Sequence, residues 1–257
     1  MKITILGSGA SYGVPVVGCS CKTCKSNNPK NKRKRVSVLV ESATTKILID
    51  TPPDLKQQAI DNDITSISAV IYTHDHADHL HGIDDLRIFN QLQGGILDIY
   101  GDEKTLSKIR EKFPYIFRVP QQFNNIWLKP SLNQITINPP EKFVIGDIEI
   151  QPFWQEHGPN RTLGFRFGNF AYSTDVNGLS EEAMQILAGV DTWVVDCLGY
   201  RKALTHAHLE MTLGWIDQLK PRVSYLTHMS HDFDYDALAS ELPENVFPAF
   251  DGLVVSC

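Results

Sequence analysis

Features that mark membrane and secreted proteins are missing from this sequence of 257 residues. No apolar run approaches the roughly 20 residues that a membrane-spanning helix requires. The stretch from Met1 to Pro15 holds one lysine and a short apolar run, which favours a strand and a turn over a signal peptide. We therefore expect a cytoplasmic protein that has no membrane partner.

An excess of positive charge is also lacking, because 24 Lys and Arg residues face 30 Asp and Glu residues, for a net charge of -6. Nucleic-acid-binding domains usually carry a basic patch or a high pI, so the composition argues against nucleic acid as a partner. Concentrated positive charge occurs in the run Lys30–Arg35. Such a run is typical of a solvated surface loop, although it could also attract a phosphate-bearing substrate.

The sequence offers no even set of cysteines for a disulfide framework. Of its five cysteines, Cys19, Cys21 and Cys24 lie within six residues, whereas Cys197 and Cys257 stand alone. This distribution suits a reducing compartment and metal ligation better than disulfides. A structural zinc ion needs a closed tetrahedral shell, so the three thiolates would require one further ligand.

Internal repeats and long linkers are absent as well, which favours one α/β sandwich domain over residues 1–257. Short runs rich in Ile, Val and Leu predict strands at Lys2–Leu6, Ser37–Glu41, Lys46–Asp50, Ala69–Tyr72, Ile96–Tyr100, Ile148–Phe153, Thr162–Phe167, Phe170–Ser173, Thr192–Val195, Val223–Thr227 and Val246–Ala249. Helical patterns occur at Asp54–Asp61, Glu103–Lys112, Glu181–Ala188 and Met211–Leu219. Ser180 precedes two acidic residues and is expected to cap the third of these helices.

Histidine is missing from residues 1–73 and from residues 82–156, yet four of the nine histidines fall within residues 74–81. This cluster follows the predicted buried strand Ala69–Tyr72 directly. Single histidines carry little information, since histidine is intermediate in its tendency to be buried. Four of them at one strand end indicate either a metal site or, as the simpler alternative, a polar loop that water satisfies.

The spacing within the cluster favours metal binding. A tight loop lets His74 and His76 project together toward one metal ion. Asp78 and His79 follow where the chain can turn into a helix, so that they point toward a neighbouring ion. Imidazole and carboxylate groups are suitable ligands for zinc, iron or manganese.

The sequence THDHADH at residues 73–79 resembles the THxHxDH signature of the metallo-β-lactamase superfamily. Further motifs of the superfamily follow in order, namely QEHG with His157, YSTD with Asp175 and YLTH with His228. Asp50, at the end of the ILID strand, resembles the superfamily's early aspartate. The resemblance covers almost the whole chain and implies a four-layer αββα sandwich that holds two divalent metal ions, zinc or manganese, in its active site.

Carried over residue by residue, the resemblance assigns ligands to both ions. The first ion would bind His74, His76 and His157. The second ion would bind Asp78, His79 and His228. Asp175 would bridge the two ions. Asp50 would orient the ligand loop without binding a metal ion itself.

One branch of the superfamily, the phosphoribosyl 1,2-cyclic phosphate phosphodiesterase of the carbon–phosphorus lyase pathway, shares further motifs. The segments GSGASYGVP, GCSC, THMSHDFD and FDG resemble its beginning and its end. In this branch His231 resembles the fourth ligand of a structural zinc ion, with Cys19, Cys21 and Cys24 as the others. Three reduced thiols without a metal ion are the alternative.

The resemblance implies hydrolysis of a small, cyclic phosphodiester such as phosphoribosyl cyclic phosphate or a 2′,3′-cyclic nucleotide. Two metal ions can activate a water molecule for in-line attack on phosphorus. His206 resembles the family's catalytic histidine and would protonate the leaving alkoxide. His208 stands where a relative has an aspartate, so it competes for that role or supports it. Asp78 counts among the catalytic residues as well as among the ligands.

Three alternative functions remain open. A tRNA 3′-processing endonuclease of the same superfamily usually carries a basic or Gly/Pro-rich arm, which residues 83–156 lack. A non-hydrolytic accessory protein of quinone-cofactor biosynthesis shares the cysteine loop, but the complete ligand set and His206 favour catalysis. A thioester or lactam hydrolase would use the same pair of ions. Members of the family often form homodimers, and this expectation extends to the present chain.

Overall fold

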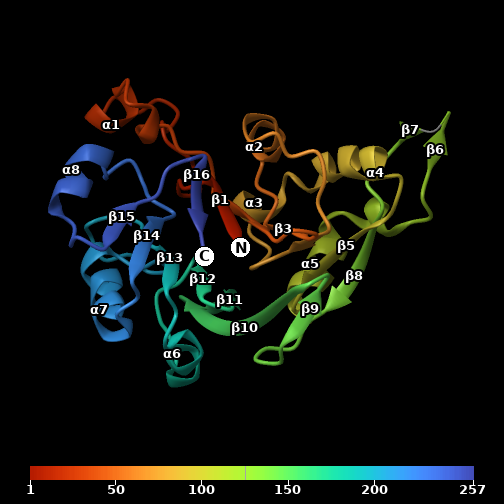
Figure 1. Ribbon diagram of the computed structural model, residues 1–257. Coiled ribbons are helices and arrows are strands. Elements are labelled where there is room, and N and C mark those ends of the chain that lie inside the picture. Colours follow the sequence, from red (N-terminus) through yellow and green to blue (C-terminus); the bar gives the residue numbers. More distant parts are fainter. Residues whose placement is uncertain (125) are drawn as a thin grey trace.

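The computed structural model describes residues 1–124 and 126–257, whose strands form two large mixed sheets and one small hairpin (Figure 1). The first sheet contains, in spatial order, β16 (Leu253–Ser256), β1 (Lys2–Gly7), β2 (Ser37–Glu41), β3 (Lys46–Ile49), β4 (Ala69–Ile71), β5 (Leu97–Gly101) and β8 (Leu132–Thr136). The second contains β15 (Val246–Pro248), β14 (Val223–Thr227), β13 (Thr192–Asp196), β12 (Phe170–Ser173), β11 (Asn160–Phe167), β10 (Ile148–His157) and β9 (Phe143–Ile145). Strands β6 (Gln122–Phe123) and β7 (Ile126–Trp127) form the hairpin, which extends away from the body of the molecule.

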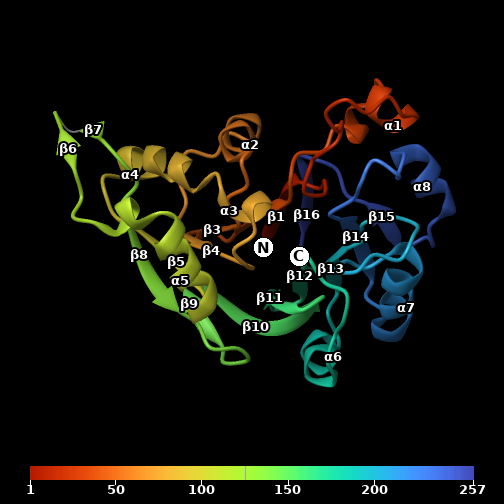
Figure 2. The same cartoon turned by 180° about the vertical axis from the view of Figure 1, so that it is seen from behind.

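Helices cover the outer face of each sheet, as the views from opposite sides show (Figures 1 and 2). The first sheet is covered by α2 (Leu55–Asp61), α4 (Arg87–Gln93) and α5 (Glu103–Lys112). The second is covered by α6 (Glu181–Leu187), α7 (Leu209–Leu219) and α8 (Tyr235–Glu241). Shorter helical turns are α1 (Lys22–Lys25), α3 (Ala77–Leu80), η1 (Pro29–Asn31), η2 (Ile83–Leu86) and η3 (Pro114–Phe117). Among the described residues, none of the helices is long and apolar enough to cross a bilayer.

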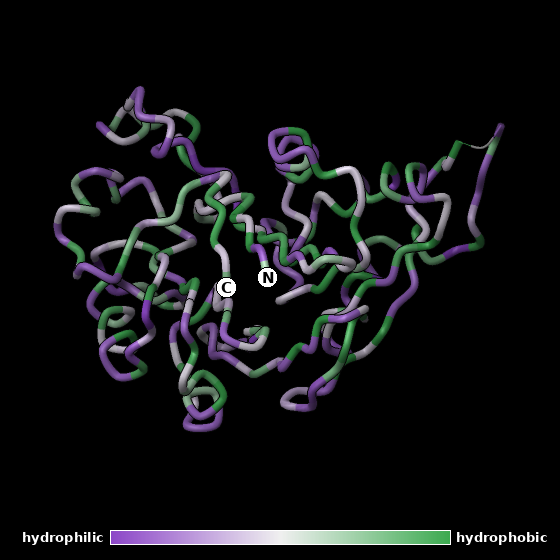
Figure 3. Tube along the Cα trace, in the orientation of Figure 1, coloured by the Kyte–Doolittle hydropathy of each residue, from purple (hydrophilic) through white to green (hydrophobic). Residues whose placement is uncertain are grey.

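Successive side chains of a strand point to opposite faces of its sheet. This alternation explains why each sheet packs against the other sheet on one face and against helices on the other. On β2, Val38 and Val40 belong to the core between the sheets, whereas Leu39 packs beneath the helices of the first sheet. On β13, Val194 faces the same central core and Trp193 faces the helices of the second sheet. Each buried side chain of this size contributes roughly 1.5–3 kcal/mol to folding. Both sheets are therefore apolar on both faces, and the expected four-layer αββα arrangement is confirmed. Hydrophobic and hydrophilic stretches follow one another along the trace (Figure 3).

Several elements have the bounds that the sequence predicts. Strands Ser37–Glu41, Phe170–Ser173 and Val223–Thr227 and helix Glu103–Lys112 are reproduced to the residue. The hydroxyl of Ser180 accepts a hydrogen bond from the backbone N–H of Ala183, as its predicted role in capping α6 requires. Strong local sequence patterns were thus sufficient to predict the bounds of these elements.

Other elements differ from the prediction. Strand β10 continues beyond Phe153 to His157, because its residues from Gln151 to His157 pair with β11 as far as Asn160. Helix α7 begins at Leu209 and not at Met211. The prediction omits the short elements α1, α3, α4, α8, β6, β7, β8, β9 and β16. Their length of two to seven residues gives little periodicity, and contacts with neighbouring elements stabilise them instead.

Candidate active site

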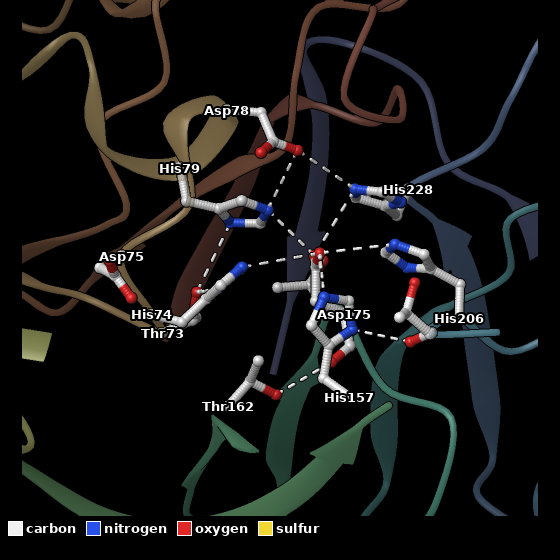
Figure 4. A network of polar contacts seen from close by, with 12 residues as sticks. Thr73, His74, Asp75, Asp78, His79, His157, Thr162, Asp175, His206 and His228 are labelled. Carbon is white, nitrogen blue, oxygen red and sulfur yellow. Dashed lines mark hydrogen bonds and ion pairs between the residues drawn. The ribbon is translucent and has the colours of Figure 1, made fainter. Parts of the chain in front are cut away.

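Polar side chains converge where strands of both sheets end (Figure 4). Asp50 follows β3, Asp175 follows β12 and His228 follows β14, and these residues have positive φ angles of 62°, 51° and 55°. Residues other than glycine seldom adopt this left-handed conformation, which costs of order 1–3 kcal/mol and is concentrated at functional sites. In each case the turn directs a side chain out of the sheet as the strand ends.

One group of possible metal ligands lies on the Oδ2 side of Asp175. Its ligand atoms belong to His74, His76, His157 and Asp175 and lie within 4.8 Å of one another. The Nε2 atoms of His74 and His157 are 3.7 and 3.8 Å from Asp175 Oδ2. The structure thereby brings together the residues expected at the first ion.

A second group lies on the Oδ1 side of the same carboxylate. It consists of Asp78, His79, Asp175 and His228, again with ligand atoms within 4.8 Å. The Nε2 atoms of His79 and His228 are 3.0 and 3.5 Å from Asp175 Oδ1. Each oxygen of Asp175 therefore faces a different group, which is the arrangement that a bridging ligand requires.

Buried nitrogen atoms that make no hydrogen bond test whether these groups suit a cation. The Nε2 atoms of His74, His79 and His228 are buried, and none makes a hydrogen bond within the described part of the chain. A buried polar atom without a partner costs about 1–3 kcal/mol. Three such atoms around ionised carboxylates fit metal ions well, because a metal ion would accept their lone pairs.

Hydrogen bonds on the far side of the rings fix the orientation of two histidines. His79 Nδ1 lies 2.7 Å from Asp50 Oδ2, and His157 Nδ1 lies 2.7 Å from the carbonyl oxygen of Thr205. A carboxylate or a carbonyl can only accept, so Nδ1 carries a proton in each ring and Nε2 is the atom that faces the site.

Asp50 is fully buried, in the place that its expected orienting role requires. It accepts hydrogen bonds from the backbone N–H and the hydroxyl of Thr73, at 2.8 and 2.7 Å. Burial raises the pKa of Asp50, although His79 and Thr73 act in the opposite direction. The carboxylate thus contacts both ends of the loop that begins the ligand cluster, and among the described residues Asp50 belongs to none of the groups that could hold a metal ion.

The charges of the site balance one another through these contacts. Burial alone would raise the pKa of Asp175, but His228 and His79 hold it well below its usual value. The pKa of Asp78 is also lowered, because His79 and His228 outweigh its burial. Both carboxylates are therefore ionised at neutral pH and available to a cation.

His206 lies beside both groups of candidate ligands. Asp196, which the sequence analysis did not single out, holds His206 in this position. Nε2 of His206 lies 3.8 Å from Asp175 Oδ2, and its ring stacks on that of His228 with centroids 4.5 Å apart. Its Nδ1 lies 2.9 Å from Oδ2 of Asp196, which is fully buried. Burial lowers the pKa of His206, but Asp196 outweighs it and raises the value to about 9.

Asp196 could have been found from the sequence. It ends an apolar strand in the sequence TWVVD, just as Asp50 follows KILI. The prediction noted this pattern at Asp50 but not at Asp196. The same carboxylate oxygen also accepts a hydrogen bond from the backbone N–H of Val176 at 2.9 Å, so that Asp196 joins His206 to the segment after Asp175.

His208 does not reach the candidate metal ligands. It is 5% exposed, and among the described residues it belongs to none of the groups that could hold a metal ion. Its Nε2 lies 3.8 Å from Glu210. Of the two histidines that compete for the role of acid, the structure brings His206 alone to the two ligand groups.

The cysteine loop forms a separate group together with His231. Cys19, Cys21, Cys24 and His231 have ligand atoms within 4.8 Å of one another, and His231 Nδ1 lies 3.4 and 3.3 Å from the first two sulfur atoms. A backbone hydrogen bond from Cys24 and the contact with His231 lower the pKa of Cys21 to about 6. Burial raises the pKa of Cys24 to about 11. Three sulfur atoms and one imidazole suit a tetrahedral zinc ion.

The basic run at Lys30–Arg35 is solvated only in part, because Lys32 is exposed whereas Arg33 is buried. Arg33 is 2% exposed and donates hydrogen bonds to the carbonyl oxygens of Ser230 and Phe233. Arg35 pairs with Asp54 at 3.0 Å. The expectation of a solvated loop is therefore wrong at Arg33, because its guanidinium group binds the backbone on both sides of His231.

Comparison with known proteins assigns the fold to a family. The model of the family "Beta-lactamase superfamily domain" matches residues 45–229. A crystal structure described as a new diphosphatase from the PhnP family has 34% sequence identity and a TM-score of 0.92, and the match covers 100% of this chain and 97% of the other. Zinc-bound PqqB from Methylobacterium extorquens has 18% identity and a TM-score of 0.81, with full coverage of both chains.

A curated relative from Porphyromonas gingivalis is named "Octanoyltransferase". It is 34% identical over 256 residues, which cover 98% of this chain and 51% of the relative. The chain thus spans about half the length of this curated relative.

Proposed function

The chain belongs to the β-lactamase superfamily and, within it, to the PhnP family, and on this premise we propose that it is a metal-dependent phosphodiesterase that acts on small, cyclic phosphodiesters. The superfamily binds divalent metal ions and consists mostly of metal-dependent hydrolases. The observation that carries the proposal is the position of Asp175, whose two oxygens face two separate groups of histidines with His206 beside them.

The proposed ligands are those that the structure brings together. One ion would be held by His74, His76, His157 and Asp175, and the other by Asp78, His79, His228 and Asp175. Manganese or zinc ions in these positions would lower the pKa of a bound water molecule and neutralise charge on the phosphoryl oxygens. A third ion, zinc, would be held by Cys19, Cys21, Cys24 and His231.

The protein's own residues supply the proton for the leaving group. Asp196 holds Nδ1–H of His206, which leaves Nε2 directed toward the two ligand groups. When Nε2 is protonated, it can donate this proton to the oxygen that leaves phosphorus, and such assistance typically contributes about 10²–10⁴-fold. An alkoxide leaving group depends on it, since an alkoxide is a poor leaving group without a proton.

Diphosphate hydrolysis is a second candidate, favoured by the description of the 34% identical structure as a diphosphatase. The same groups suit both reactions, because each transfers a phosphoryl group to water. The name of the Porphyromonas gingivalis relative suggests acyl transfer instead. This chain matches only 51% of that protein, so the named activity need not belong to the matched part.

A panel of substrates tests the proposal. The protein would be loaded with manganese or zinc and assayed on bis-p-nitrophenyl phosphate, a ribosyl 1,2-cyclic phosphate, 2′,3′-cyclic AMP, ADP and an octanoyl thioester. We expect turnover of the diesters, highest for a cyclic one, and none of the thioester. Turnover of ADP alone would establish the diphosphatase instead. Absence of any hydrolysis with metal bound would favour a non-hydrolytic accessory protein.

A further inference from the structure

Asn177 lies at the point where two catalytic loops meet. It is two residues beyond Asp175, and its backbone N–H donates to the carbonyl oxygen of Glu156 at 2.8 Å. Glu156 in turn donates from its backbone N–H to Gly178 at 2.9 Å. These bonds fix the backbone of Asn177 against the end of β10, next to the strand residue His157.

The side-chain amide of Asn177 binds one loop with each of its ends. Its Oδ1 accepts from the backbone N–H of Gly158 at 3.0 Å, and its Nδ2 donates to the carbonyl oxygen of Leu204 at 2.8 Å. Gly158 directly follows His157, and Leu204 lies two residues before His206. The orientation of the amide is fixed, because a backbone N–H can only donate and a carbonyl can only accept.

Three further observations show that these loops are packed closely together. His157 Nδ1 donates to the carbonyl oxygen of Thr205 at 2.7 Å. Gly158 has a φ of +60°, and a Cβ atom at this position would lie 2.7 Å from Cγ2 of Thr205. The rings of His157 and His206 lie 4.8 Å apart between centroids. A small displacement of either loop would therefore change the position of His206 relative to His157.

We propose that Asn177 is a positioning residue that sets the place of the proton donor His206 relative to the ligand His157. This inference rests on the proposed phosphodiesterase function. Other side chains of similar size cannot replace the amide: aspartate could accept from Gly158 but could not donate to Leu204, and alanine could do neither. Asn177 acts through the backbone of the two loops and does not touch the reacting atoms.

Substrates with different leaving groups distinguish a misplaced general acid from general damage to the site. Departure of p-nitrophenolate needs little protonation, whereas departure of an alkoxide depends on the general acid. Asn177→Asp and Asn177→Ala would be compared with wild type on bis-p-nitrophenyl phosphate and on a ribosyl cyclic phosphate. We expect kcat to fall about 10–100-fold on the cyclic phosphate, with less than tenfold loss on the nitrophenyl ester. KM should change little on either substrate.

Metal content and thermal stability are measured in parallel on the same preparations. Both variants should keep the wild-type number of active-site metal ions. Asn133→Ala serves as the matched control, since Asn133 is an exposed amide on edge strand β8 that binds Asp98. It should retain wild-type rates on both substrates.

A double variant tests whether Asn177 acts through His206. If Asn177 acts through His206, the double variant Asn177→Asp with His206→Ala should be no slower than His206→Ala alone, because coupled residues are not additive. Equal losses on both substrates, loss of metal ions or additive effects in the double variant would overturn the proposal. An inactive wild-type protein would contradict the phosphodiesterase function itself, which is a different outcome.

Discussion

At the scale of single residues, the pairing of Asp196 with His206 distinguishes this site from a simple metal centre. Oδ2 of Asp196 contacts both Nδ1 of His206 and the backbone N–H of Val176, and all three groups come from different segments. A buried carboxylate of this kind holds a histidine in one tautomer and stabilises its charged form. Such a contact would suit His206 to the proposed proton transfer.

Asp196→Asn tests this role, because the amide oxygen can still accept both hydrogen bonds while the charge is lost. We expect kcat on a cyclic phosphate to fall roughly 10–100-fold with little loss of thermal stability. Asp191→Asn is the control, since Asp191 pairs with Arg222 at the surface. Unchanged kcat in the Asp196 variant would remove the carboxylate from the mechanism.

The two histidines of the THAH segment should respond differently to substitution. His206→Ala is expected to keep both active-site metal ions and to lose about 10²–10⁴-fold in kcat on substrates with an alkoxide leaving group. His208→Ala should keep most of its turnover, because the structure does not bring His208 to the ligand groups. Metal analysis and steady-state kinetics decide between them, and the opposite ranking would transfer the acid role to His208.

At the scale of elements, the segment from His228 to His231 joins the two candidate metal centres. Met229 exchanges backbone hydrogen bonds with the segment Ser8–Ala10, which leads into the cysteine loop. The cysteine loop is therefore packed against the strand end that carries His228. Its own group of candidate ligands, however, shares no residue with those of the active site among the described residues.

Cys21→Ser should remove the structural zinc ion and lower thermal stability while leaving the active-site pair of ions in place. The expected zinc content is one equivalent below that of wild type by elemental analysis. Cys257→Ser is the control, because Cys257 lies outside the cluster. Simultaneous loss of all metal ions from the Cys21 variant would contradict two separate sites.

Asp251 lies in the turn between β15 and β16, and the titration of its carboxyl group should change the free energy of unfolding measurably. Burial raises the pKa of Asp251 to about 6, although Lys34 and Ser8 lower it. Since the native protein then binds more protons than the unfolded chain between pH 4 and 6, this group contributes stability at low pH that is lost as the pH rises through that window.

The expected loss is about 3 kcal/mol between pH 4 and 7, from 1.36 kcal/mol per unit of pKa. It would be measured as the difference in unfolding free energy between wild type and Asp251→Asn, so that other titrating groups cancel. A difference that does not vary with pH would show that Asp251 titrates normally.

At the scale of the whole molecule, both sheets contribute candidate ligands to one centre. The loop after β4 supplies four of the predicted ligands from the first sheet, His74, His76, Asp78 and His79. Strands β10, β12 and β14 lead to the others from the second sheet, His157, Asp175 and His228. Metal ions bound there would connect the two halves of the sandwich.

Removal of these ions should therefore destabilise the whole fold. A ligand present at 100 times its dissociation constant stabilises the native state by about 2.7 kcal/mol. For a chain of this size, this corresponds to a decrease in Tm of roughly 5–10 °C on chelation. Calorimetry before and after treatment with EDTA would measure it, and recovery of Tm with manganese or zinc is the control. An unchanged Tm would mean that the sheets hold together without the ions.

The sequence by itself determined the elements and residue clusters that depend on near neighbours. The spacing of THDHADH and the strand-end aspartate Asp50 pointed to residues that the structure brings together, and strongly apolar runs gave correct bounds for several strands. Such patterns are readable because strand periodicity and ligand spacing involve residues only a few positions apart. Such local patterns could not predict three features of the structure. These are the choice of His206 over His208, the contact of Asp196 with His206 and the burial of Arg33. Each of these depends on segments distant in the chain, and only the packing of two sheets and their connecting loops decided which of them meet.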